Sequence, residues 1–105
     1  MNHFNGLSPA EQERLAILSE ELGECVQAIG KILRHGYESY HPHFPDRGTN
    51  RRQLERELGD VLFAMTLISE AGDLSMESIY ERAREKDETT RQYLHHQDIP
   101  SATRE

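Results

Sequence analysis

Residues that crosslink a chain or fill sheets are scarce in this sequence. Among its 105 residues there is one cysteine, Cys25, and only two are valine. A single thiol excludes an internal disulfide framework and a cysteine-only zinc site, because both need several thiolates. The shortage of valine disfavours sheets, which β-branched residues usually fill. We therefore expect an all-α protein, with Cys25 as a small core residue.

Long apolar runs and an excess of positive charge are also missing. No stretch approaches the roughly 18 apolar residues of a membrane span, and residues 1–7 lack the pattern of a signal peptide. These two absences predict a cytoplasmic protein. The net charge of −7 disfavours binding to a nucleic acid polymer or to an acidic membrane, since both need a basic surface on the protein. An anionic ligand would therefore need a cation as intermediary.

The first third of the sequence predicts one long helix. Ser8 can cap its free amides, Pro9 suits the first helical position, and Glu11 completes a capping box. Apolar residues then recur at helical spacing until Gly36, a typical C-terminal stop. They are Leu15, Leu18, Leu22, Cys25, Val26, Ile29, Ile32 and Leu33. We place this helix at about Pro9–His35.

A long loop and two further main helices follow. The 15 residues Gly36–Asn50 contain two prolines, two glycines and several aromatic and histidine side chains, with no helical period. A second helix, capped by Thr49 or Asn50, runs to Gly72, and a third begins after Ser75. The apolar stripe of the second helix is made of Leu54, Leu58, Val61, Leu62, Met65 and Ile68.

The length of the chain indicates one domain. We expect residues 1–97 to form a single all-α helical bundle and residues 98–105 to be a disordered tail. The third helix is weakly apolar and is expected to break near Thr89 and Thr90.

Two acids on the second helix fall within apolar surroundings. At about 100° per residue, Glu57 lies on the flank of the apolar stripe, and Asp60 lies between Ala64 and Leu67. Burial of two unpaired carboxylates is expensive, so they must take up protons or be neutralised by a cation, which a metal ion does most fully. The alternative is a pair of surface acids at the margin of a helix.

Three more acids, Glu20, Glu21 and Glu24, lie within about 100° of arc on the first helix. Taken alone, such an acidic cluster is typical of a solvated helix face. Two helices that each offer carboxylates three residues apart can, however, oppose four oxygen donors across a bundle. This arrangement suits hard divalent ions such as Mg²⁺ and Mn²⁺.

The two acidic motifs, EELGE at residues 20–24 and ELGD at residues 57–60, resemble a known signature. They are similar to the EExxE and ExxD motifs of the MazG-like all-α nucleoside triphosphate pyrophosphohydrolases. The resemblance extends over about Leu15–Lys86 and includes the surrounding text, LSEELGECVQAIGKILRHG and LERELGDVLFAM. The spacer between the motifs is longer than is usual in that family, and the 15-residue loop accounts for the excess. This departure leaves the substrate specificity open.

The resemblance implies a ligand set and a reaction. The implied metal ligands are Glu21, Glu24, Glu57 and Asp60, with Glu20 beside them as a catalytic residue that orients water. The expected reaction is hydrolysis of a nucleoside or deoxynucleoside triphosphate between the α and β phosphates, with water as nucleophile, to give the monophosphate and pyrophosphate. Mg²⁺ is the expected cofactor and Mn²⁺ a substitute.

Three other interpretations of the acids compete with this one. A di-iron bundle wants Glu-x-x-His on a helix, and the only such spacing, Glu38 with His41, lies in the loop before a proline. Phosphoribosyl-ATP pyrophosphatase chemistry shares the carboxylate arrangement and stays open. A helical interaction module, in which the acids only keep the chain soluble, is the alternative from another class, and metal binding separates it from an enzyme.

Basic and aromatic residues supply candidates for substrate contacts. Lys31 lies on the same side of the first helix as Glu20 and Glu24 and can reach a phosphate. Lys86 is a second phosphate-binding candidate, because the family that the chain resembles tends to place a basic residue on the helix after ExxD. Each can instead be a surface ion-pair partner. Further candidates of this kind are Arg34, Arg82 and Arg91.

The loop carries two candidates for contact with a nucleobase, Tyr37 and Tyr40. Loops longer than about 12 residues are often lids or binding loops, and aromatic faces can stack on bases. Alternatively, these side chains pin the loop to the bundle.

The charge and the wide apolar arc of the second helix indicate an oligomer. Three highly charged helices bury little surface, and one neighbour cannot cover that arc. We expect at least a homodimer. The family resemblance implies the same, with a bundle completed across subunits as a homodimer or homotetramer.

Overall fold

The computed structural model describes residues 5–97, and within this range the chain is helical, with no strand. It divides into two compact units, one ending at Leu74 and one beginning at Ser75. The first unit contains α1 (Pro9–His35), the 3₁₀ helix η1 (Pro45–Arg47) and α2 (Asn50–Glu70). The second contains α3 (Met76–Thr90) and the 3₁₀ helix η2 (Arg91–Tyr93). The prediction of an all-α chain is confirmed.

Two expectations about domain limits keep their status as predictions. The single domain expected over residues 1–97 stays a prediction, and the expected disordered tail, residues 98–105, lies outside the described residues. Along the described part of the chain, no helix is long and apolar enough to cross a membrane.

The predicted capping box starts α1. The backbone amide of Glu11 donates to the Ser8 hydroxyl oxygen at 3.1 Å, and the Ser8 amide donates to the Glu11 carboxylate at 2.9 Å. Both bonds satisfy amides that the first helical turn leaves free. The helix ends where Gly36 adopts φ 88°, a conformation that side chains other than glycine rarely take. Contacts among residues near each end therefore determine where α1 begins and ends.

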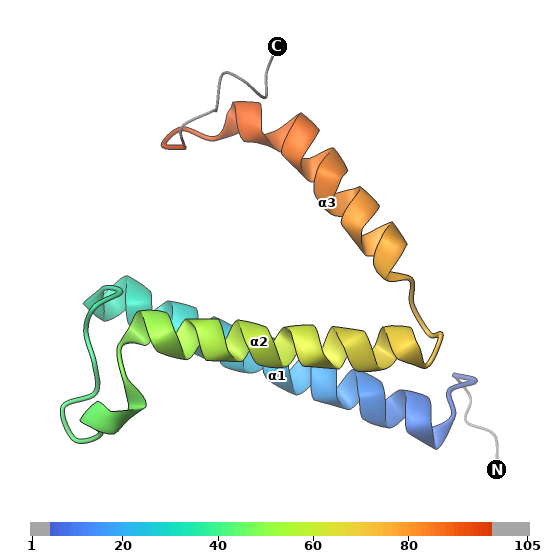
Figure 1. The fold of residues 1–105 in the computed structure, drawn as a ribbon, viewed down its shortest axis with the longest axis horizontal. Helices are drawn as coiled ribbons and strands as arrows, with labels where there is room; N and C mark the ends of the chain where they lie inside the picture. Colours follow the sequence, from blue (N-terminus) through green and yellow to red (C-terminus); the bar gives the residue numbers. More distant parts are fainter. Residues whose placement is uncertain (1–4, 98–105) are drawn as a thin grey trace. The chain divides into compact units, whose positions relative to one another are not determined.

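Helices α1 and α2 form an antiparallel hairpin (Figure 1). At the end of the hairpin away from the loop, the Arg14 guanidinium binds the Asp73 carboxylate through two hydrogen bonds of 2.7 and 3.3 Å. A fork-shaped cation on a carboxylate fixes orientation as well as distance. This pair ties α1 to the turn that follows α2.

The loop between the helices is ordered by backbone contacts that its irregular sequence does not predict. Tyr40 and Thr49 form an isolated antiparallel bridge, and η1 lies between them. Thr49 caps α2 by accepting a hydrogen bond from the Arg52 amide at 3.2 Å. Asn50, the other predicted cap, is buried instead and donates to the Gly36 carbonyl at 3.1 Å. Asn50 therefore joins the start of the loop to its end.

The second unit is described on its own. Ser75 caps α3 as predicted, because its hydroxyl oxygen accepts a hydrogen bond from the Ser78 amide at 3.2 Å. The helix ends at Thr90, where a break was expected, and a single 3₁₀ turn follows.

The faces that α1 and α2 turn toward each other include only part of the predicted apolar stripes, with Cys25 and Ile68 buried there. Cys25 and Ala28 of α1 and Ala64 and Ile68 of α2 are the buried hydrophobic residues among those described. Several leucines of the predicted stripes remain exposed. They are Leu15, Leu22 and Leu33 on α1 and Leu58 and Leu62 on α2, and they keep between 43% and 82% of their surface. Within the described residues, the hairpin therefore covers only part of the predicted stripes.

Candidate metal centre

Four acids meet midway along the hairpin. They are Glu21 and Glu24 of α1 and Glu57 and Asp60 of α2, and one carboxylate oxygen from each lies within 4.8 Å of the others. We call this group the carboxylate cluster. Each helix contributes two acids three residues apart, so both side chains project from one face and meet the pair on the other helix.

The cluster is embedded in the hairpin and is not spread over a solvated face. Glu21, Glu24 and Glu57 are half-buried, and Asp60 is exposed. The Oε2 atoms of Glu21 and Glu57 are buried without a hydrogen-bond partner. A buried polar atom without a partner is costly, so these two oxygens indicate a missing positive group.

The electrostatics of the cluster also indicate a missing positive charge. Burial raises the pKa of Glu57 to about 7, and the nearby carboxylate of Glu24 adds to the shift. The pKa of Glu21 is also raised, first by burial and then by the negative charges of Glu24 and Asp60. Desolvation and like charge both disfavour the ionised forms. Without a cation, the raised pKa lets Glu57 keep its proton to a higher pH than a glutamate in water.

The donor set fits a hard divalent cation. All four side chains offer only oxygen, which suits Mg²⁺ or Mn²⁺ better than a soft metal. The burial of Cys25 beside the cluster raises the pKa of its thiol, and the four carboxylates raise it further, so the thiol stays protonated there. The cluster therefore offers four oxygen ligands and no thiolate.

Other predicted site residues stand apart from the cluster. Glu20 is exposed next to Glu21, so its expected role as water-orienting residue stays a prediction. Lys31 lies further along α1 and is exposed. Lys86 is exposed on α3, in the second unit, and its expected contact with phosphate also stays a prediction.

The two tyrosines of the loop have different surroundings. The guanidinium of Arg51 lies over the Tyr37 ring, 4.4 Å from its centroid, and the Arg51 amide donates to the Tyr37 carbonyl at 2.9 Å. One face of Tyr37 is thus already covered. Tyr40 is 56% exposed and lines a cavity at the loop end of the hairpin. Contact of either ring with a nucleobase stays a prediction.

Two residues of the loop region were missed by the sequence analysis. Arg47 lies over the Phe44 ring at 3.9 Å and lines the same cavity as Tyr40. Asn50 was considered only as a helix cap, although its side chain closes the loop. The three-residue spacing of Arg47 from Phe44 within a turn was the one available signal for the first, and no local pattern marks the second.

Comparison with known proteins gives a consistent result. A sequence model of the MazG nucleotide pyrophosphohydrolase domain matches residues 10–94. The chain is also 32% identical over 84 residues to the uncharacterized protein YpjD of Bacillus subtilis (strain 168), in an alignment that covers 73% of this chain and 68% of YpjD. No solved structure matches the chain significantly.

Proposed function

The chain belongs to the MazG nucleotide pyrophosphohydrolase family, and from that premise we propose that it hydrolyses a nucleoside or deoxynucleoside triphosphate between the α and β phosphates. The products would be a nucleoside monophosphate and pyrophosphate. Mg²⁺ is the proposed cofactor, and Mn²⁺ is expected to replace it.

One observation carries the proposal most strongly. The carboxylate cluster brings four acids from two helices to within 4.8 Å and leaves two of their buried oxygens without partners. A purely structural group of acids at this position would destabilise the hairpin and give nothing in return. A divalent cation relieves both the repulsion and the missing contacts.

The residues of the cluster have distinct proposed roles. Glu21 and Glu57 would hold the cation through their buried oxygens, and Glu24 would complete the set from α1. Asp60, the exposed member, would meet the substrate from the solvent side. When bound, a divalent cation supplies positive charge to the phosphate oxygens and makes water more acidic. Glu20, exposed next to Glu21, would orient the attacking water.

The proposal is tested with a panel of nucleoside and deoxynucleoside triphosphates in the presence of Mg²⁺ or Mn²⁺. Release of pyrophosphate, and not of phosphate, is the expected result, and chelation of the metal should stop it. Glu57→Gln should reduce turnover by at least about 100-fold, because the variant loses a ligand of the cation. Glu70→Gln, an exposed acid on the same helix, is the matched control and should keep full activity.

Absence of hydrolysis across the whole panel, or equal activity in Glu57→Gln and the parent, would contradict the proposal. In that case a non-catalytic helical interaction module becomes the better explanation of the hairpin.

A further inference from the structure

A cavity of about 670 Å³ lies at the loop end of the hairpin, apart from the carboxylate cluster. We call it the loop pocket. Its walls come from the last turns of α1, the loop and the first turn of α2. Its basic and imidazole side chains are Lys31, Arg34, His35, His41, His43 and Arg47. No acidic residue lines it among those the structure describes.

The three cations of the loop pocket are available for a ligand. Within residues 5–97, none of Lys31, Arg34 and Arg47 forms an ion pair with a carboxylate. The acid of the same loop, Glu38, is instead bound by Arg51 at 2.6 Å, outside the pocket. In a chain of net charge −7, a pocket lined by three cations that form no ion pair among the described residues, and by no acid, favours an anion.

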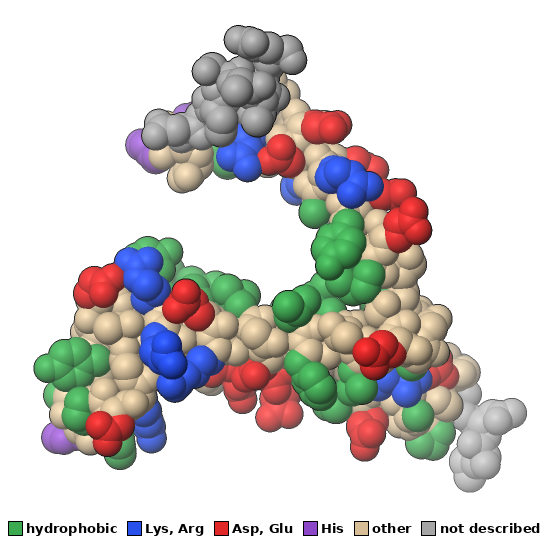
Figure 2. Space-filling view, in the orientation of Figure 1, with side chains coloured by type: hydrophobic (Ala, Val, Ile, Leu, Met, Phe, Trp, Pro, Cys, Tyr) green, Lys and Arg blue, Asp and Glu red, His purple; other side chains and the backbone are tan. Residues whose placement is uncertain are grey.

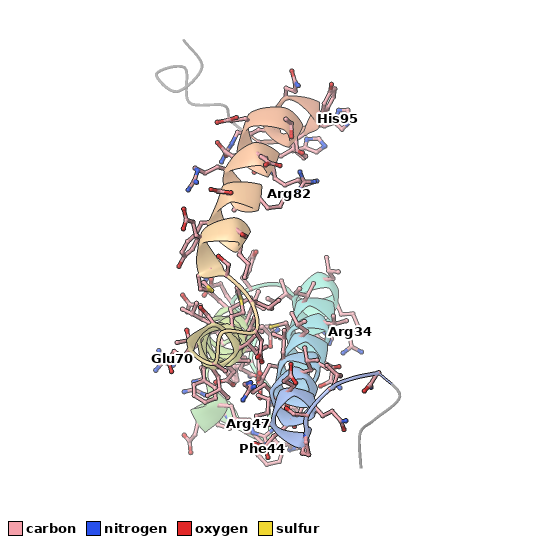
Figure 3. The ribbon with its side chains drawn as sticks, turned by 90° about the vertical axis from the view of Figure 1, so that its right-hand side faces the viewer. Arg34, Phe44, Arg47, Glu70, Arg82 and His95 are labelled. Carbon is pink, nitrogen blue, oxygen red and sulfur yellow. The ribbon has the colours of Figure 1, made fainter. Side chains whose placement is uncertain are left out.

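Arg47 is held in place within the pocket. Its guanidinium lies 3.9 Å from the centroid of the Phe44 ring, and its carbonyl accepts a hydrogen bond from Arg56 at 3.4 Å. Figure 3 labels Arg47 and Phe44 in the loop and Arg34 on α1. A cation whose orientation is already fixed loses less entropy when it binds a phosphate.

The loop pocket continues the side of the hairpin on which the acids lie. Lys31 follows Glu24 by seven residues, and Gln53, another lining residue, precedes Glu57 by four. These spacings correspond to rises of about 10 and 6 Å and to nearly the same helical direction. In Figure 2, blue side chains gather near the loop end of the hairpin with some red ones beside them, and further red side chains stand midway along it. One extended anionic substrate can therefore reach from the cluster into the pocket.

We propose that the loop pocket binds the outer, β and γ, phosphates of the substrate, so that the leaving pyrophosphate points toward the loop. This inference rests on the proposed function. Arg34 and Arg47 would then set the direction in which the substrate lies and the preference for a triphosphate. In this arrangement the Tyr40 hydroxyl would donate a hydrogen bond to a phosphate oxygen, and its ring would not stack on a base.

The first experiment measures binding without catalysis. Inorganic tripolyphosphate is titrated in the presence of EDTA, where the carboxylate cluster carries no cation and repels the probe. The parent should bind it, and the double variant Arg34→Gln/Arg47→Gln should bind it roughly 10-fold more weakly, as expected for lost charge-assisted hydrogen bonds. Arg52→Gln is the matched control, because Arg52 has the same charge, lies on the first turn of α2 and does not line the pocket.

The second experiment compares kcat/KM for a nucleoside triphosphate and the matching diphosphate. The parent should prefer the triphosphate, and the double variant should lose roughly 10-fold of that preference while Arg52→Gln retains it. Unchanged tripolyphosphate binding in the double variant would overturn the inference. So would a Tyr40→Ala variant that changes the base preference while the arginine substitutions leave the phosphate preference intact, because the pocket would then hold the base. A parent that binds tripolyphosphate yet hydrolyses no nucleotide would count against the proposed function and leave the anion site standing.

Discussion

Glu57 combines a high energetic cost with a central place in the hairpin. Its buried oxygen has no partner, and three other carboxylates surround it. A cation that binds only the folded chain stabilises that chain by mass action. The residue therefore links stability to metal binding more directly than any other member of the cluster.

Replacing Glu57 by glutamine separates stability from activity. Without metal, Glu57→Gln should be as stable as the parent or more stable, because one of the repelling charges is removed. Mg²⁺ should raise the melting temperature of the parent, and the variant should lose most of that gain. Thermal melts with and without Mg²⁺ check this, with Glu70→Gln as control. Equal Mg²⁺-induced shifts in parent and variant would remove Glu57 from the metal site.

The raised pKa of Glu57 predicts a pH dependence of the metal-free protein. The folded-state value is about 7, against 4.5 for an unperturbed glutamate, so the folded chain binds more protons than the unfolded chain between these values. Stability is then retained below about pH 4.5 and falls as the pH rises toward 7. A loss of the order of 2 kcal/mol is expected after allowance for solvent screening.

Urea denaturation in EDTA at several pH values measures this effect. Glu57→Gln should flatten the profile over that range, and saturating Mg²⁺ should oppose the fall, since the cation competes with protons for the same oxygens. A parent profile that rises from pH 4.5 to 7 would show that Glu57 ionises freely in the fold.

At the residue level, the acids could be predicted, but the pocket in which Lys31 and Arg34 meet Arg47 could not. The helical spacing of Glu21, Glu24, Glu57 and Asp60 is a local property, and pairing the two motifs required only that their helices be neighbours. Arg47 reaches its position through the bridge between Tyr40 and Thr49, which no periodic pattern announces. Irregular backbone depends on specific hydrogen bonds, and a sequence does not show them.

At the level of elements, the boundaries of the helices follow from caps. Ser8, Thr49 and Ser75 each accept a hydrogen bond from an amide of the first turn, and these short-range contacts are readable from the sequence. Which face of each helix becomes buried depends less on the local sequence. The stripes of α1 and α2 are wide enough to serve two neighbours, and the small residues Ala28 and Ala64 decide which side meets the other helix.

Asn50 is expected to stabilise the loop connecting these helices. Its buried amide donates to the Gly36 carbonyl, so Asn50→Ala would leave that carbonyl without its partner. We predict a loss of about 1–2 kcal/mol in unfolding free energy, measured by denaturant titration. Gln27→Ala, an exposed polar residue of α1, is the control and should change stability little. A loss no greater than that of the control would show that the loop closes without Asn50.

At the scale of the whole molecule, the exposed apolar stripe of α1 favours association with a partner. Leu15, Leu22, Val26, Ile29 and Leu33 repeat along one side of the helix and are 43% to 82% exposed. Surfaces of this kind mark sites of association. A second copy of the chain is the proposed partner, which keeps the homodimer or homotetramer expected from the sequence.

Sedimentation should therefore show a species heavier than 12.1 kDa at micromolar concentration. Val26→Glu places a charge in the stripe and should shift the equilibrium toward the monomer, because the charge would be desolvated in the interface. Ala16→Gln, an exposed position on another side of α1, should not. A parent that sediments as a monomer would exclude the assembly.

The single thiol of the chain gives a way to observe the hairpin in motion. Cys25 is 6% exposed and lies between α1 and α2, so a maleimide can reach it only when the two helices separate. The labelling rate thus reports the frequency of that opening, with no background from other thiols. The carboxylates beside Cys25 repel one another until a cation binds them. Bound Mg²⁺ should therefore make separation of the two helices less frequent and slow the labelling of Cys25.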